Sequence, residues 1–203
     1  AIPVTGSAAA MVDEFRAFQV HDCYLIVAGD EGVEIIDQHA LHERILYEHL
    51  RSRVLAGGVE RQRLLMPDPI ECTAPEAAVL MEHQELLREI GFEVEEFGGT
   101  TILLTAYPVL VPRGDLAAIL RDIAGQLEQN DGRTSRRDLL DHMLHTMACR
   151  AAIKSGQRLT SEEMRELLRQ RHLVQDSHHC PHGRPTSLTL TRATLDQQFG
   201  RLG

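Results

Sequence analysis

The sequence lacks an apolar run long enough to cross a membrane. A spanning helix needs about 18 or more consecutive apolar residues, and the longest candidate, residues 100–111, is shorter and contains Pro108. Residues 1–12 also lack the basic region and apolar run of a secretory signal. Their small side chains are typical of a linker remnant, so we expect a fragment of a longer chain that makes no membrane contact.

Basic residues and cysteines are also scarce. The 21 Lys and Arg against 30 Asp and Glu give a net charge of −9. Phosphate contacts need Lys and Arg, so this balance argues against a protein that holds nucleic acid unaided. It does not exclude a DNA enzyme that another protein delivers. The 4 cysteines, without a secretory signal, favour reduced thiols or metal ligands over disulfides.

What remains is an ordinary globular composition, with 43% hydrophobic and 25% charged residues, which excludes disorder, coiled coil and collagen for most of the chain. At about 150 residues per domain, the 203 residues predict one domain, or one domain with a sizeable insertion. The middle block has its own helix–hairpin–helix pattern. We therefore expect an α+β fold in which residues 13–70 and 135–203 form one small sheet-and-helix subdomain, and residues 71–134 form an inserted α/β subdomain.

Hydrophobic periodicity and turn residues predict the individual elements. The expected strands are 14–21, 24–28, 33–37, 62–70, 92–97, 100–109 and 188–191. The expected helices are 39–55, 75–90, 115–129, 135–155 and 194–199, and a capping box at Thr160–Glu163 predicts another helix that ends at Arg171. The segment 175–185 has no regular period and is expected to be a loop.

The first group of candidate site residues lies where a strand leads into a helix. Asp37 ends the strand, and His39 and Glu43 stand one turn apart on the same helix face, about 5–6 Å apart at Cβ. A carboxylate and an imidazole at this spacing can share a divalent metal. The alternative is a capped helix start with a solvated His–Glu pair. Glu48 lies farther round the helix, off this site.

The second group is the loop Cys180-Pro181-His182-Gly183-Arg184-Pro185. Cys180 and His182 can point into one site, and a thiolate suits Zn²⁺. Arg184 could bind a carboxylate or a phosphate with two hydrogen bonds. The alternative is an ordinary loop with an unligated thiol.

Two further features allow more than one interpretation. Cys149 shares a helix face with His142 and His145, but a buried cysteine in such a helix usually serves packing. The segment Gln62–Pro67 is extended, apolar and bounded by proline. It predicts either an edge strand or a linear peptide that inserts its Gln and apolar side chains into a groove of a partner.

Together these segments resemble the C-terminal endonuclease domain of MutL-type DNA mismatch-repair proteins. Residues 37–48 reproduce the family pattern DQHA-x2-E-x4-E, and Ala148-Cys149-Arg150 resembles its second motif. Residues 180–185 match its third motif, CPHGRP, at every position. Phe199-Gly200-Arg201 matches the terminal F-x-R, and residues 62–67 look like the clamp-binding Q-x-x-[LI]-x-P. Five motifs in the family's order make coincidence very improbable.

The resemblance implies a dimerisation subdomain that carries a metal site, together with an inserted regulatory subdomain. It implies an enzyme that nicks one strand of duplex DNA during mismatch repair and is activated by a sliding clamp and the other repair proteins. The family's N-terminal ATPase half, of the GHKL type, has no counterpart in these residues. The expected location is the bacterial cytoplasm, near the nucleoid.

The resemblance also assigns roles. Asp37, His39, Glu43, Cys149, Cys180 and His182 would be metal-site residues, with Asp37 and Glu43 serving the chemistry. Gln62, Leu64, Leu65 and Pro67 would bind the clamp, while Glu48, Arg184 and Arg201 would support the site. It further implies catalytic Mn²⁺ and structural or regulatory Zn²⁺.

The partners that it implies are a second copy of the chain, a sliding clamp, duplex DNA held weakly, and a MutS-type mismatch sensor reached through the full-length protein. The alternatives are a non-catalytic, zinc-stabilised dimerisation module and a metallohydrolase that acts on a small molecule.

Overall fold

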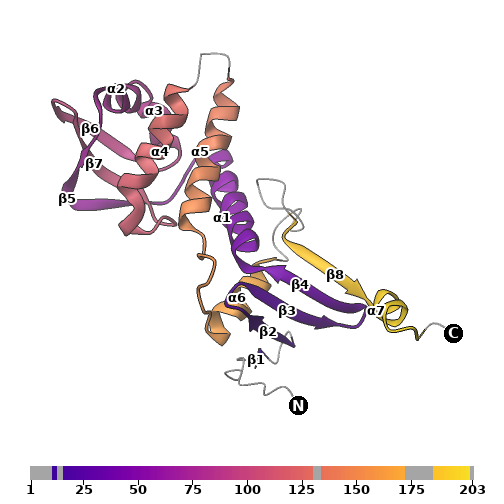
Figure 1. The fold of residues 1–203 in the computed structure, drawn as a ribbon. Helices are drawn as coiled ribbons and strands as arrows, with labels where there is room; N and C mark the ends of the chain where they lie inside the picture. Colours follow the sequence, from indigo (N-terminus) through magenta and orange to yellow (C-terminus); the bar gives the residue numbers. More distant parts are fainter. Residues whose placement is uncertain (1–10, 13–15, 130–133, 172–184, 202–203) are drawn as a thin grey trace. The chain divides into compact units, whose positions relative to one another are not determined.

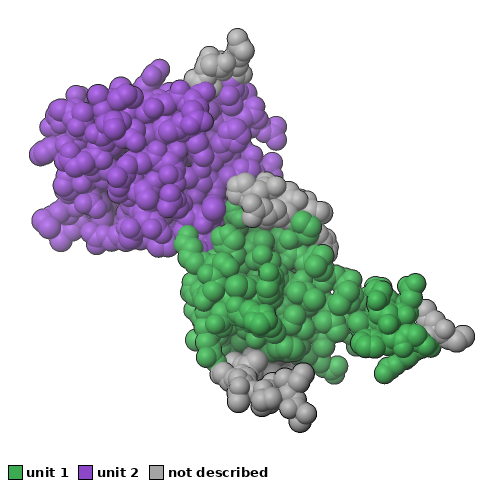
Figure 2. Space-filling view, viewed as in Figure 1, with its two compact units in different colours: residues 1–45, 153–203 green, residues 46–152 purple. Residues whose placement is uncertain are grey.

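A computed structural model of the chain describes residues 11–12, 16–129, 134–171 and 185–201 (Figure 1). Within these residues it is a mixed α+β fold with two small antiparallel sheets, which confirms the expected class. The described helices include none that is both long and apolar enough to span a membrane. The chain divides into two compact units, unit 1 with residues 1–45 and 153–203, and unit 2 with residues 46–152 (Figure 2).

Unit 1 is built from both ends of the chain around a five-stranded sheet of order β1-β2-β3-β4-β8, in which every neighbouring pair is antiparallel. Its strands are β1 (Met11–Val12), β2 (Ala17–Val20), β3 (Tyr24–Gly29), β4 (Gly32–Asp37) and β8 (Ser187–Thr191). Its helices are the start of α1 (Gln38–Leu55), α6 (Ser161–Arg171) and α7 (Arg192–Gln198). Within the expected strand over 14–21, Ala17–Val20 pair with β3, whereas Arg16 and His21 lie in turns.

One face of this sheet forms the core of unit 1. Successive side chains in a strand point to opposite faces, and Leu25 and Ile36, which pair across β3 and β4, both point to the core. There they pack with Leu41 and Ile45 of α1 and with apolar residues of α6. The α6 helix begins with the expected capping box, in which Glu163 accepts from the Thr160 backbone N and Thr160 Oγ1 accepts from the Glu163 backbone N.

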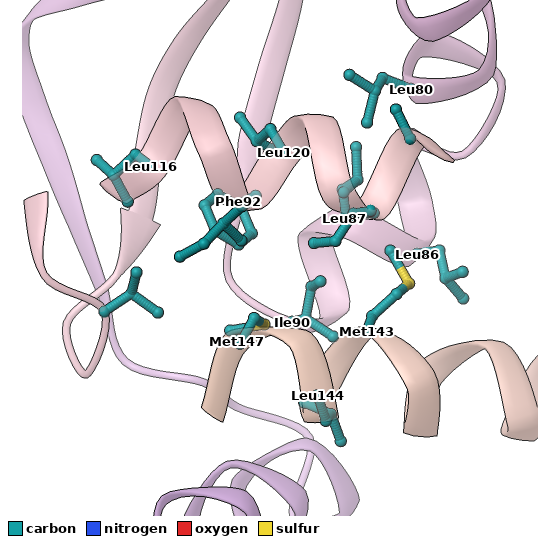
Figure 3. Close-up of a cluster of buried hydrophobic side chains, with 14 of the residues drawn as sticks. Leu80, Leu86, Leu87, Ile90, Phe92, Leu116, Leu120, Met143, Leu144 and Met147 are labelled. Carbon is teal, nitrogen blue, oxygen red and sulfur yellow. The ribbon is translucent and has the colours of Figure 1, made fainter. Parts of the chain in front are cut away.

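Unit 2 contains a three-stranded sheet of order β5-β7-β6, packed against helices. Its elements, after the second part of α1, are β5 (Arg61–Glu71), α2 (Ala74–Glu82), α3 (Gln84–Glu89), β6 (Glu93–Gly98), β7 (Thr101–Pro108), η1 (Arg113–Asp115), α4 (Leu116–Glu128) and α5 (Arg136–Ala151). Figure 3 shows Phe92, Leu120 and Met147 among the side chains of its core. The α1 residues Leu46 and Leu50 belong to the same core, as the helical spacing predicted.

Two expected helices differ from the structure. The single helix over 75–90 is wrong, because His83 adopts φ −104° and ψ 25° and separates α2 from α3. The helix over 135–155 is too long, because α5 ends at Ala151 and Ala152 is extended, with ψ 151°. The division between the units also falls within α1 and just after α5, so unit 2 extends beyond the expected insertion of residues 71–134 on both sides.

Candidate functional site

The carboxylate of Asp37 caps the N-terminus of α1. Its Oδ1 accepts hydrogen bonds from the backbone N of His39 at 3.0 Å and of Ala40 at 3.1 Å. The backbone N of Asp37 donates to the Thr186 oxygen at 2.8 Å, which ties the end of β4 to the segment before β8. A side chain with both helix-capping bonds has a fixed orientation, so one oxygen of Asp37 is held in place by the backbone.

Gln38 anchors the first turn of α1. Its side chain is fully buried, and Nε2 donates to the backbone oxygens of Asp22 and Gln157, each at 2.8 Å. Its Oε1 accepts from Gln19 Nε2 at 2.6 Å. Both amide hydrogens and the amide oxygen are thus bonded, as a buried polar group requires. The helix start is therefore fastened to the β2–β3 hairpin and to the segment around Gln157.

His39 and His42 both bind the backbone of Ile153. His39 Nδ1 donates to the Ile153 oxygen at 2.7 Å, because a carbonyl can only accept. The Ile153 N–H donates to His42 Nδ1 at 2.9 Å. Burial and the nearby His39 lower the pKa of His42 to about 4. His42 is therefore neutral at physiological pH, as its acceptor role requires.

Glu43 lies inside the protein, with only 3% of its surface exposed. His39, one turn earlier, is half-buried. The alternative interpretation of a solvated His–Glu pair is therefore wrong for the glutamate. Burial of a carboxylate is costly unless a partner, such as a hydrogen-bond donor, a cation or a metal, compensates it. Glu48 lies farther along α1, where its Oε2 is 4.0 Å from Arg51.

The predicted metal-site residues fall in both units and partly outside the described residues. Asp37, His39 and Glu43 lie at the start of α1 in unit 1, and the half-buried Cys149 lies on α5 in unit 2. The remaining members, Cys180 and His182, and the supporting Arg184, lie outside the described residues. Among the described residues, no group of three or more His, Cys, Asp or Glu side chains could hold a metal ion. The metal centre stays a prediction.

Two arginines of the other motifs, Arg150 and Arg201, have defined contacts in the structure. Arg150, next to Cys149, forms an ion pair with Asp122 through Nη2 at 2.6 Å and joins α5 to α4. Arg201 is exposed, and its guanidinium lies 5.9 Å from the centre of the Phe199 ring. Its backbone N donates to the Asp196 oxygen at 2.7 Å. These contacts keep Arg201 close to the end of α7.

The predicted clamp-binding segment protrudes from β5. The register between β5 and β7 shifts between Arg63 and Asp68, so residues 64–67 stand opposite Thr105. Leu65 is fully exposed, at 101%, and Met66 is 78% exposed, whereas Leu64 packs against the core of unit 2. Proline lacks a backbone N–H, which suits Pro67 to an irregular strand. Leu65 and Met66 thus offer apolar side chains to solvent.

Sequence reasoning missed three residues that shape the start of α1: Gln38, His42 and Ile153. The positions of His39 and His42, three residues apart on one helix, were a signal, because side chains at that spacing are neighbours. Nothing in the sequence indicated that the backbone of Ile153 would lie between their rings. That contact joins residues more than a hundred positions apart.

Comparison with known proteins identifies the family. Residues 17–159 match the model of the family described as "MutL C terminal dimerisation domain". The chain belongs to this family. The family resemblance inferred from the five motifs is thereby confirmed.

Relatives support the same assignment. The DNA mismatch repair protein MutL of Phenylobacterium zucineum is 39% identical over 90% of this chain, and that of Trichlorobacter lovleyi is 35% identical over 98%. The matched regions make up 29% and 33% of those two proteins. The chain thus spans about a third of the length of the relatives it matches.

Proposed function

We propose that the chain is a metal-dependent endonuclease domain that nicks one strand of duplex DNA during mismatch repair. The observation that carries this proposal is the ordered start of α1. There a carboxylate fixed by two backbone N–H groups precedes a histidine fixed through Nδ1 and a buried glutamate. The motif residues of the second and third segments add the remaining candidate ligands.

The donor groups at the start of α1 are of the types that bind divalent cations, and these three alone do not form a site. The bond from His39 Nδ1 to Ile153 leaves Nε2 as the ring nitrogen with a lone pair in neutral imidazole. Glu43 adds an oxygen ligand of the kind that Mn²⁺ prefers, and the thiolates of Cys149 and Cys180 suit Zn²⁺. We assign Asp37, His39, Glu43, Cys149, Cys180 and His182 to this centre. Bound divalent ions would activate a water and neutralise charge on the leaving oxygen.

A second copy of the chain would bind the outer face of the unit 1 sheet. Cross-strand pairs place Phe18, Ile26, Ile35 and Leu188 in one row across β2, β3, β4 and β8. These residues point away from the face that carries Leu25 and Ile36. Leu188 is 62% exposed. An apolar row of this kind on a sheet is suited to a homodimer interface, and the family description names dimerisation.

The net charge of the chain and the exposed segment 62–67 bear on two further partners, DNA and a sliding clamp. A net charge of −9 gives weak attraction to phosphates, so cutting should depend on delivery to DNA. Gln62, Leu64, Leu65 and Pro67 would bind the groove of a sliding clamp, with Leu65 fully exposed and Leu64 also packed partly against the core of unit 2. Contact with a MutS-type mismatch sensor would come through the full-length protein.

Nicking of supercoiled plasmid with Mn²⁺ tests the activity. We expect weak nicking by the chain at physiological salt, stronger nicking with a clamp loaded on the DNA, and none by Asp37→Asn. Asparagine keeps the helix cap, so this variant loses the charge and retains the fold. Full nicking by Asp37→Asn would overturn the assignment, and strong nicking without a clamp would contradict the expected dependence on delivery.

Metal content separates the nuclease from the zinc-stabilised dimerisation module. We expect bound zinc in the purified chain and its loss in Cys180→Ser. Bound zinc without nicking, even with a loaded clamp, would support the non-catalytic module instead. Absence of any bound metal would show that the Cys and His residues had been misinterpreted.

A further inference from the structure

The backbone of Ile153 contacts both histidines of α1. Its N–H donates to His42 Nδ1 at 2.9 Å, and its oxygen accepts from His39 Nδ1 at 2.7 Å. Ile153 follows directly on the end of α5, where Ala152 is extended and closes the helix. The backbone N–H and oxygen of Ile153 thus bond to side chains of α1 and take no part in the hydrogen bonding of α5.

These two bonds determine where each ring carries its proton. The N–H of Ile153 needs an acceptor, so neutral His42 must carry its hydrogen on Nε2. The oxygen of Ile153 needs a donor, so neutral His39 must carry its hydrogen on Nδ1 and keep a lone pair on Nε2. The two histidines are thus set in opposite tautomers by one residue.

We infer that His42 is a positioning residue, which holds Ile153 so that the Ile153 oxygen fixes His39 with Nε2 available to a divalent metal. The motif pattern leaves position 42 variable, so no role follows from it. Groups that orient a metal-binding histidine through its other nitrogen typically change metal affinity by about 10- to 100-fold when removed. The link to metal rests on the proposed function, whereas the tautomer of His39 does not.

A matched pair of variants tests this role. In His42→Asn, the side-chain oxygen can take the place of Nδ1 and accept from Ile153, whereas His42→Leu fills the space without an acceptor. We expect Mn²⁺ affinity, measured by titration calorimetry, to fall about 10- to 100-fold in His42→Leu and to be restored to within a few-fold in His42→Asn. Equal affinities in the wild type and His42→Leu would overturn the inference.

Nitrogen NMR of the metal-free chain gives a readout that needs neither metal nor activity. The ¹⁵N shifts of the His39 ring, assigned against His39→Gln, should report the hydrogen on Nδ1 in the wild type and in His42→Asn, and a mixture of tautomers in His42→Leu. A His39 ring with its hydrogen on Nε2 in the wild type would contradict the inference.

The wild type alone offers one more test, which holds even if His42→Leu does not fold. The N–H···N bond should give a ¹⁵N–¹⁵N coupling between the Ile153 amide and His42 Nδ1, and its absence would count against the inference. If the wild type binds no Mn²⁺, the proposed function fails, while the tautomer result still decides the role of His42.

Discussion

Gln38 and Gln157 are joined by a hydrogen bond of 2.8 Å, from the side-chain Nε2 of Gln38 to the backbone oxygen of Gln157. The bond fastens the first turn of α1 to the segment that leads into α6. Gln19 donates to the same oxygen at 2.9 Å and accepts from the backbone N of Leu159 at 3.1 Å. Two glutamines therefore hold this segment against the start of α1.

Replacing Gln38 by leucine should destabilise unit 1 by about 2 to 4 kcal/mol, because buried groups left without a hydrogen bond cost about 1–3 kcal/mol each. Hydrogen exchange of the β3 and β4 amides measures the loss. Gln129→Leu, at the exposed end of α4, is the control and should stay within about 0.5 kcal/mol. Unchanged exchange in Gln38→Leu would show that the network contributes little.

The boundaries of most elements could be predicted from local sequence. A capped helix start was one interpretation of residues 37–43, and Thr160 with Glu163 predicted a capping box, because both features depend on residues within one helical turn. The face of α1 that carries Leu46 and Leu50 followed from the helical period. These features need no knowledge of distant contacts.

The features that were missed depend on distant contacts. Just after α5 ends at Ala151, Ile153 bonds to two histidines of α1, and no local pattern encodes these bonds. Burial of Glu43 likewise arises from packing around α1, so its sequence neighbours could not distinguish a solvated carboxylate from a buried one. The motif match supplied the candidate ligands, but not the contacts that orient them.

The dimer interface can be tested with a charge in the apolar row. Leu188→Arg should convert the dimer to a monomer, because an arginine buried in an apolar interface would lose its hydration without a partner. Phe97→Arg is the control, since Phe97 is similarly exposed at 66% but lies in unit 2. Sedimentation velocity measures both. A Leu188→Arg dimer of unchanged stability would place the interface elsewhere.

Clamp binding should depend on Leu65. Truncation to alanine is expected to weaken binding about tenfold or more, as for an apolar anchor at the centre of an interface. The matched control is Leu55→Ala, because Leu55 is also exposed, at 78%, near the end of α1. Surface plasmon resonance with immobilised clamp gives both affinities. If the two variants lose the same affinity, or neither loses any, the segment 62–67 is not the contact.

Gly32 allows β8 to approach β4. A Cβ built on Gly32 would lie 2.2 Å from the backbone oxygen of Leu190, and its φ of +147° is one that other residues rarely adopt. Gly32→Ala should therefore destabilise the pairing of β4 with β8 by about 2 kcal/mol or more. Hydrogen exchange of the β8 amides measures this. Gly29→Ala, whose Cβ would meet nothing closer than 3.8 Å, should leave that exchange nearly unchanged.

The capping box of α6 should make unit 1 sensitive to acid. Hydrogen bonds from the backbone and side chain of Thr160 lower the pKa of Glu163 below its usual 4.5. The unfolded chain therefore binds this proton at a higher pH than the folded chain does. The stabilisation is present above about pH 4.5 and is lost as the pH falls through the lowered folded pKa.

Glu163→Gln tests the origin of this acid sensitivity. The glutamine side chain can still accept a hydrogen bond from the Thr160 backbone N. The variant should therefore keep the capping box at all pH values and lose the stabilisation that depends on the charge of Glu163. Thermal denaturation of the wild type and the variant between pH 7 and pH 3 compares the two. The difference in stability should shrink as the pH falls below about 4.5. A constant difference over this range would show that the charge on Glu163 does not stabilise α6.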